Sequence, residues 1–545
     1  MFASQSSSSS QTCSSSQWQI AVEQLLVWLV FLGHVGLLVP EVNEPYYLAK
    51  AKFFWNPSWC PKDFFLQTGD GHAVYCWMFG WLTQVLSLPT TAIVGRVMIC
   101  GFFAVAWQRL LMAVAPTRWL SVIAAALFVL LTSRLHMAGE WALGGVESKG
   151  FAYAAVFAAL AAIVRNRWNL GWVLLGGATA LHGLVGGWAL LATAFGWCWL
   201  SNDSERPTLR SMLPAIFAGV LIALTSVVPG LRLSSGVDPQ IATEASWVQV
   251  FKRLPHHLSP QQFFLQPGWW NIPFGVRFAL LGIAWFAMQR RLRDAPSRRL
   301  AAIVMGSLAI AILGLIIAVV FRNDELTAAR LLRFYWFRLA DVLLPAGAAT
   351  AVVATIASTR VARPLFSGGM MALVLLIGMG HMAAVANWHL AQDIPAADRK
   401  FLKSNEKYRH WTRACDFARN ETPADAIFIV PIHAHTFKWY ADRADTGVWK
   451  EMPQDAKSVM DWWHCLSDVH LSDVHRGADG WRKSLNEASP QHLQAMAARY
   501  NAQYVLTESD PPLPFPKRFE NGSFTIYQLV PRKDNPQNGR EMDRN

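Results

Sequence analysis

The sequence predicts an all-α membrane bundle of about 11 spans, followed by a small soluble α/β domain. Two observations predict this architecture. Hydrophobic residues make up 53% of the chain and charged residues only 15%, whereas a soluble globular chain carries about 25% charged residues. The charge is also unevenly distributed, because residues 388–545 hold 21 Lys+Arg and 21 Asp+Glu, whereas residues 1–387 hold 27 and 15.

The whole positive excess therefore belongs to the apolar part of the chain. Lys and Arg in such a chain are typical of loops that face the cytoplasm and its anionic lipid head groups. No basic run is interleaved with aromatic residues in the pattern of a nucleic-acid surface. We therefore expect membrane lipids, and no nucleic acid, as partners.

The chain divides into three parts. Residues 1–17 are rich in Ser and Gln and uncharged, which predicts a disordered tail. The tail lacks a basic region and a cleavage site, so we interpret 18–39 as a retained first span of a polytopic domain, 18–387. A loop at 40–72 follows this span, and the soluble domain is expected at 388–545.

The remaining spans are expected wherever about 20 apolar residues occur together. The stretch 170–200 is too long for one straight span and contains paired glycines on both sides of His182. It is either one kinked span or two half-helices with His182 at the turn. The other candidates are 73–90, 92–114, 118–133, 149–164, 211–230, 274–289, 300–321, 339–358 and 365–386.

The orientation follows from the distribution of Lys and Arg. The loop 290–299 is the most basic, so we expect it in the cytoplasm. Counting spans from this loop places the domain 388–545 outside the cytoplasm, in a multi-pass protein of the cell membrane. Loop 40–72 is also outside if the uncharged tail is cytoplasmic. The segment 134–148 lies outside only if 73–90 is re-entrant, and the sequence leaves this open.

The pattern changes from about residue 388. Helices are expected at 398–420, 455–465 and 491–500, and strands at 426–430, 504–507 and 523–530. Strands that alternate with helices are typical of an α/β domain.

Three carboxylates in loop 40–72 are candidate catalytic residues: Glu41, Glu44 and Asp63. A carboxylate at the membrane boundary can act as a general base, because partial desolvation raises its basicity. The alternative is a solvated loop with ion pairs to its lysines, which is common for surface carboxylates.

A second cluster comprises Glu140, Glu147 and Lys149, between two apolar spans. Charges there are costly in lipid, so they must face water, protein or a ligand, and we consider them candidate substrate-binding residues. The alternative is a polar loop. His182 could join this cluster, although a lone His in an apolar helix is more often a hydrogen-bonded core residue.

A third cluster is formed by Arg330, Arg333 and Arg338, which can share part of a helical face near aromatic residues. Arg binds phosphate in a bidentate manner, so Arg330 and Arg333 are candidates for gripping a lipid phosphate. The alternative is an interfacial belt that fixes the end of a helix.

These features together resemble the GT-C superfamily of membrane glycosyltransferases. The resemblance rests on a first span, an acidic loop ending in Tyr (NEPYY, 43–47), many further spans and a C-terminal soluble domain. The chain is also similar to a family of uncharacterised bacterial polytopic membrane proteins with the motifs GEWxLGGxExK, here 139–149, and TPxDAxFIxP, here 422–431. The paired Asp-Glu of several GT-C loops is absent, because Val42 and Asn43 separate Glu41 from Glu44.

The resemblance implies transfer of a sugar from a polyprenyl-phosphate donor at the outer membrane face. Glu44 or Asp63 would be the general base, with Glu41 as a further catalytic candidate, and Arg330, Arg333 or Lys149 would neutralise the departing phosphate. The metal ligands are unknown, although a divalent ion could assist. The alternative is a non-enzymatic transporter or lipid-binding membrane protein.

Overall fold

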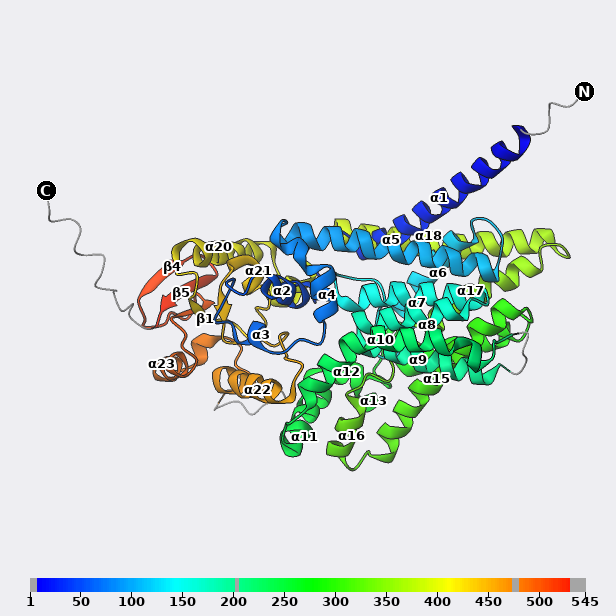
Figure 1. Ribbon diagram of the computed structural model, residues 1–545. Coiled ribbons are helices and arrows are strands. Elements are labelled where there is room, and N and C mark those ends of the chain that lie inside the picture. The colour runs from blue at the N-terminus through cyan, green and yellow to red at the C-terminus, as the bar shows by residue number, and fades with distance from the viewer. Residues whose placement is uncertain (1–6, 201–204, 473–479, 530–545) are drawn as a thin grey trace, which may run out of the picture.

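The computed structural model describes residues 7–200, 205–472 and 480–529. Figure 1 shows a long helical bundle with a small domain containing a β-sheet at one end. We call the end of the bundle that contacts this domain the domain end. The opposite end carries the Arg-containing loops at 115–119, 165–167, 290–294 and 359–363, and we call it the basic end.

Eleven apolar helices form the bundle within the described residues. Six are long and apolar enough to cross a membrane: α1 (Ser7–Val35, apolar from Gln17), α5 (Leu88–Val114), α10 (Leu209–Ser234), α15 (Ala295–Val320), α17 (Ala340–Ser358) and α18 (Pro364–Leu390). Four are shorter apolar helices: α6 (Leu120–Arg134), α7 (Ser148–Val164), α9 (Gly183–Trp199) and α14 (Phe274–Gln289). The fifth is α8 (Trp168–Leu181), a helix of 14 residues that packs against α7 and α10. The expected multi-span all-α bundle is confirmed.

The first helix begins earlier than expected. Helix α1 starts at Ser7, inside the stretch 1–17 that the sequence predicts to be a disordered tail. Residues 1–6 of that stretch lie outside the described residues. The apolar part of the helix begins at Gln17, next to the predicted start of the first span.

The predicted span 73–90 is wrong. This stretch forms two short helices, α4 (Ala73–Met78) and η1 (Gly80–Gln84), which pack against α2 (Glu44–Trp55). The next helix, α5, starts independently, because the Ser87 side chain accepts a hydrogen bond from the Thr90 amide and Pro89 occupies the first turn. The chain therefore stays at the domain end from loop 40–72 to the start of α5.

The stretch 170–200 forms two packed helices rather than one kinked span. Helices α8 and α9 meet at His182, which ends the first helix and begins the second. A Cβ atom on Gly186 would lie 2.1 Å from the Thr179 amide nitrogen, so glycine permits this close approach. The hairpin brings His182 to the domain end.

Short helices cover the domain end of the bundle. They are α3 (Phe64–Gln67), α11 (Pro239–Trp247), η2 (Val248–Arg253), α12 (Pro255–Leu258), α13 (Pro260–Phe263), η3 (Trp269–Asn271) and α16 (Glu325–Leu332).

The C-terminal domain is a five-stranded mixed sheet with helices, as expected for a small α/β domain. The sheet order is β2-β1-β3-β5-β4, with β1 parallel to β2 and β3, and β5 antiparallel to β3 and β4. The strands are β1 (Ile427–Ile429), β2 (Ala444–Asp445), β3 (Tyr504–Glu508), β4 (Lys517–Glu520) and β5 (Phe524–Gln528). The helices are α19 (Ala396–Leu402), α20 (Asn405–Glu421), α21 (Phe437–Ala441), α22 (Ala456–His470), η4 (Leu485–Glu487) and α23 (Pro490–Arg499).

Candidate active site

A buried charge network lies at the domain end of α7. The Lys149 ammonium is 3.5 Å from a Glu140 oxygen and 3.4 Å from a Glu147 oxygen. The Arg338 guanidinium donates to the other Glu140 oxygen at 2.9 Å. All four side chains are at most 9% exposed. We call these four residues the charge network, and it contains three of the predicted substrate-binding residues.

The segment that carries Glu140 is fixed by a carboxylate from α17. Asp341 accepts hydrogen bonds from the backbone amides of Met137, Ala138 and Glu140, at 2.7, 2.8 and 3.1 Å. Burial alone would raise the pKa of Glu140, but Arg338 and Lys149 hold it well below its ordinary value. Glu140 is therefore ionised and held in place.

His182 joins the network through the α8–α9 hairpin. Its Nε2 lies 3.3 Å from Nη1 of Arg338, and the guanidinium can only donate. The His72 ring lies 5.0 Å from the His182 ring, and its Nδ1 is 3.2 Å from the Ser148 hydroxyl. The structure thus places Glu140, Glu147, Lys149 and His182 together.

Asn43 connects this network to the C-terminal domain. Its amide nitrogen donates to Glu147 at 3.0 Å, and its amide oxygen accepts from the Lys450 ammonium at 2.8 Å. Burial, followed by the positive charge of Arg253, lowers the pKa of Lys450 to about 7. The site is consequently built from both parts of the protein.

Glu44 does not fit the predicted role of general base. Arg96 donates to both of its oxygens at 2.7 Å, and the amides of Glu41 and Val146 donate to them at 2.7 and 2.9 Å. Each oxygen therefore accepts two hydrogen bonds from protein groups, and the side chain is fully buried. Glu44 fixes loop 40–72 against α5 and leaves no free position for a substrate.

Asp63 does not fit this role either. It caps α3 by accepting from the Leu66 amide at 2.9 Å. Its other oxygen accepts from Lys438 at 3.0 Å and from the Asp445 amide at 3.2 Å. The side chain is fully buried, so Asp63 connects loop 40–72 to the C-terminal domain.

Glu41 has a different environment. Its side chain is half-buried, and it takes part in none of the ion pairs between described residues. Burial is the largest influence and raises the pKa of Glu41, although Arg96 opposes this. A Cβ atom on Gly145 would lie 2.6 Å from the Glu41 Cβ, so Glu41 lies against the segment that carries Glu147.

The three arginines of the predicted phosphate-binding cluster have different environments. Arg330 is exposed, and Arg333 donates to the Ser246 hydroxyl at 3.2 Å and stacks on Phe334. Neither takes part in the charge network. The member of this sequence cluster that does is Arg338, which also lies over the Tyr335 ring at 3.8 Å.

The carboxylates do not form a metal site. Among the described residues, no group of three or more His, Cys, Asp or Glu side chains could hold a metal ion. Lysine and arginine lie where a cation would be held, since Lys149 and Arg338 neutralise Glu140 and Glu147. The side chains present therefore do not fit the divalent ion that the resemblance implies.

Sequence reasoning missed three residues of the site. Asn43 was present only as part of the NEPYY motif, and His72 and Lys450 carried no local signal. Nothing in the sequence places Lys450, because its partner Asn43 is more than 400 residues away. The position of Asn43 between two glutamates is the one signal that could have drawn attention to it.

Comparisons with known proteins agree with the fold. A family model described as a domain of unknown function (DUF6798) matches residues 409–469. The archaeal oligosaccharyltransferase AglB from Archaeoglobus fulgidus superposes with a TM-score of 0.50 at 13% identity, over 90% of this chain and 69% of that chain. ArnT from Cupriavidus metallidurans gives a TM-score of 0.49 at 14% identity, over 94% of this chain and 98% of that one. No curated protein sequence matches the chain significantly.

The similarity to AglB establishes the class of fold. The chain is a multi-span membrane protein that shares the fold of AglB, and the multi-span bundle with a C-terminal domain is what its sequence led us to expect.

Proposed function

We propose that this protein is a membrane glycosyltransferase that moves a sugar from a polyprenyl-phosphate donor to an acceptor hydroxyl. The observation that carries the proposal is the charge network, which lies beside Glu41, a carboxylate that takes part in no ion pair between described residues. The AglB structure, whose fold this chain shares, holds a dolichol phosphate. That ligand has the chemistry that such a site would receive.

The proposed reaction is a displacement at the anomeric carbon of the sugar. The acceptor oxygen forms a bond to this carbon, the bond from the carbon to the phosphate oxygen breaks, and the lipid phosphate leaves. Glu41 takes the proton of the acceptor hydroxyl, and its raised pKa suits a general base. Lys149, Arg338 and Lys450 stabilise the negative charge of the departing phosphate.

The balance of charge in the network supports this assignment. Lys149 and Arg338 neutralise Glu140 and Glu147, so Lys450 adds net positive charge when it is protonated. Buried Arg338 also has an Nε–H without a hydrogen-bond partner among the described residues. A phosphate would satisfy both features.

The proposed orientation places the site and the C-terminal domain outside the cytoplasm. The eleven apolar helices bring Arg118, Arg165, Arg167, Arg290 and Arg360 to the basic end, which is the cytoplasmic end by the distribution of positive charge. Because α4 and η1 stay at the domain end, segment 134–148 lies on the same side as loop 40–72.

The test uses purified full-length protein in lipid nanodiscs with a panel of radiolabelled polyprenyl-phosphate sugars and acceptors. We expect sugar release or transfer by the parent protein. Glu41→Gln should lower kcat by about 10²-fold or more, in the range of general-base catalysis, and should leave donor binding intact.

The matched control is Glu406→Gln, an exposed carboxylate on α20. Equal turnover by Glu41→Gln and Glu406→Gln would exclude Glu41 as the base. Donor binding without turnover across the whole panel would favour the alternative of a transporter or lipid-binding protein.

A further inference from the structure

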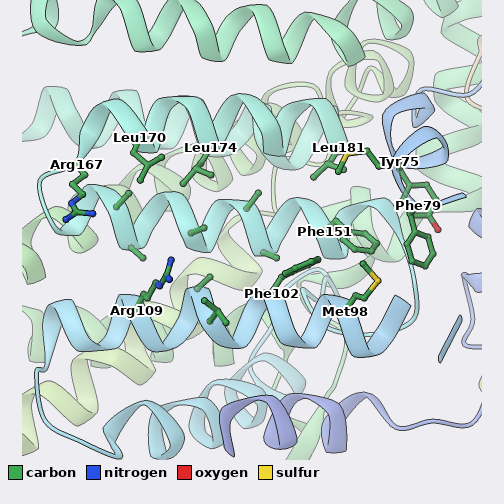
Figure 2. A pocket seen from close by; sticks show the side chains of 18 of the residues that line it. Tyr75, Phe79, Met98, Phe102, Arg109, Phe151, Arg167, Leu170, Leu174 and Leu181 are labelled. Carbon is green, nitrogen blue, oxygen red and sulfur yellow. The ribbon is translucent and has the colours of Figure 1, made fainter. Parts of the chain in front are cut away.

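An apolar groove runs along the lipid-facing side of α7. Its floor is the row Ala154, Ala155, Ala158, Ala161 and Ala162, and its walls come from α5 and α8 (Figure 2). The volume of the groove is about 670 Å³. Small side chains on the floor leave this space open, so an elongated apolar chain could lie along α7.

Aromatic rings close the groove at the domain end. Tyr75 stacks on Phe79 at 5.8 Å, and Phe79 and Tyr75 lie 5.3 and 6.2 Å from Phe151. Figure 2 shows these three side chains together at one end of the groove. Tyr75 also lies 6.0 Å from the Tyr47 ring, which lies 5.4 Å from the His72 ring, so a continuous row of aromatic rings lies between the groove and His72.

Three arginines surround the other end, which is the basic end of the bundle. Arg109 comes from α5, and Arg165 and Arg167 come from the connection between α7 and α8. All three side chains are exposed. Among the ion pairs between described residues, none involves any of them. Three positive charges thus remain unneutralised beside an apolar channel.

We propose that this groove binds one anionic phospholipid from the leaflet at the basic end. Its phosphate lies among Arg109, Arg165 and Arg167, and one of its acyl chains lies along the alanine floor. Guanidinium groups bind phosphate oxygens in a bidentate manner, and the apolar floor excludes water from the chain. The positive charge at one end of the groove therefore selects an anionic head group, and the apolar floor selects an acyl chain.

The dimensions suit an acyl chain. From Leu170 to Leu181, the stretch of α8 that lines the groove is roughly 17 Å long at the rise of an α-helix. One leaflet contributes about 15 Å, half of the ~30 Å hydrocarbon core. A single acyl chain that starts at the arginines would therefore end near the aromatic rings.

The same features argue against the polyprenyl donor as the occupant. A donor with its phosphate at the charge network would have to pass its chain through the aromatic rings of Tyr75, Phe79 and Phe151 to enter the groove. The open and charged end lies on the opposite side of the membrane from that network. The inference is therefore independent of the proposed glycosyl transfer.

The test measures retained lipid in full-length protein purified from mixed phosphatidylglycerol and phosphatidylcholine membranes, by native mass spectrometry. We expect one phosphatidylglycerol to be retained in preference to phosphatidylcholine. Affinity should fall by about fivefold for each arginine changed to Gln, since each basic residue near an anionic surface contributes about one such factor. Ala158→Phe, which fills the groove floor, should also abolish retention.

The matched control is Arg360→Gln with Arg363→Gln, two exposed arginines at the basic end that do not line the groove. If Arg109→Gln, Arg165→Gln and Arg167→Gln retain as much phosphatidylglycerol as this control, the arginines form no head-group site. If Ala158→Phe, purified from the same membranes supplemented with polyprenyl phosphate, loses polyprenyl phosphate but retains phosphatidylglycerol, the groove belongs to the donor. Either result would overturn the proposal, whether or not the protein transfers sugar.

Discussion

The Arg96 guanidinium donates to both oxygens of Glu44 inside the protein, whereas Glu41, three residues earlier in the chain, takes part in no ion pair among the described residues. Breaking a buried pair by removing one charge is costly, because the other charge stays buried without compensation. The two carboxylates therefore have separable roles, one in folding and one in the proposed chemistry.

Glu44→Gln should reduce the free energy of unfolding by about 3–5 kcal/mol, the cost of an uncompensated buried Arg96. The loss of stability is measured as a lower melting temperature in detergent, monitored by size-exclusion chromatography of the heated samples. Glu41→Gln is the control and should unfold at nearly the parental temperature. A Glu44→Gln protein as stable as the control would contradict the structural role of the pair.

The lowered pKa of Lys450 leads us to predict how the affinity for the donor depends on pH. Its pKa is lowered to about 7, so its positive charge is present below this pH and lost as the pH rises through it. The KM for an anionic donor should therefore rise above about pH 7. Lys450→Arg should retain the low KM up to pH 9, because arginine stays protonated. An unchanged pH profile in Lys450→Arg would exclude Lys450 as a phosphate ligand.

At the scale of elements, pairs of glycines distinguish packed from lipid-facing sides of α8 and α9. A Cβ on Gly176 would lie 2.3 Å from the Gly219 carbonyl oxygen of α10, whereas one on Gly177 meets nothing within 4 Å. Gly186 is likewise in close contact with α8, whereas a Cβ on Gly187 would meet nothing within 4 Å. The glycines therefore let the three helices α8, α9 and α10 approach closely.

Gly176→Ala and Gly186→Ala should each destabilise the bundle by about 1–3 kcal/mol through overpacking. The melting temperature in detergent measures this effect. Gly177→Ala and Gly187→Ala are matched controls on the same turns and should melt like the parent protein. Equal melting temperatures for all four variants would show that α8 and α9 do not pack as the structure indicates.

Elements were predicted from sequence where hydropathy alone decides them. Most spans follow directly from apolar length, and the glycines around His182 indicated a break there. The prediction of a span at 73–90 failed for a local reason. Apolar content alone does not show that Ser87 and Pro89 start a new helix. Among the three arginines of one cluster, only Arg338 faces Glu140, and helical spacing cannot distinguish it from its neighbours when the helix ends at Leu332.

The candidate site was predicted only in part for the same reason. Glu140, Glu147, Lys149 and His182 are recognisable because charged or polar groups are rare among apolar spans. Glu44 and Asp63 attracted attention for the same chemical reason, yet their partners Arg96 and Lys438 lie far away in the chain. Ion pairs between residues so far apart in the chain depend on the tertiary fold. The tertiary fold therefore determines which of the three carboxylates of loop 40–72 remains available to a substrate.

At the scale of the whole molecule, one lysine joins the bundle and the C-terminal domain. Lys438 is fully buried among Asp63 of loop 40–72 and two carboxylates of its own domain, Asp445 and Glu451, at 3.0, 2.5 and 2.6 Å. Burial raises the pKa of Asp445 to about 6 and that of Glu451 well above its ordinary value, although Lys438 opposes both. One cation does not neutralise three carboxylates.

This cluster should make domain docking weaker as the pH rises. A carboxyl group with a raised folded-state pKa contributes its full stability below the unfolded value of about 4, and loses it as the pH rises through about 6. The protection factors for hydrogen exchange in loop 40–72, which are corrected for the pH dependence of intrinsic amide exchange, should therefore be higher at pH 5 than at pH 8. Equal protection factors at both pH values would contradict this account.

Lys438→Met should accelerate that exchange at every pH, because it leaves Asp63 and its neighbours buried without a cation, at a cost of about 3–5 kcal/mol. Lys62→Met is the matched control. It removes an ion pair to Asp425 that joins the same two parts but is more than half exposed, and such pairs contribute little. Similar exchange rates in both variants would rule out the buried cluster as the main connection.

The proposed orientation is testable by cysteine labelling in intact cells, in a background without the native cysteines. Glu406→Cys on α20 should react with a membrane-impermeant maleimide, whereas Arg293→Cys at the basic end should react only after the membrane is opened. Both positions are exposed. The reverse pattern would place the C-terminal domain in the cytoplasm.

The bridge through Asn43 has a consequence for how the protein matures in the cell. Loop 40–72 is among the first segments to leave the ribosome, but Lys438 and Lys450, to which Asp63 and Asn43 bind, are made near the end of synthesis. Glu44 can pair with Arg96 as soon as α5 is made, but Asp63 has no lysine partner until the last domain arrives. A chain interrupted before that point would keep the charge network of the bundle but lack Lys450 and the Asp63–Lys438 ion pair, so the site is complete only when the C-terminal domain has been made.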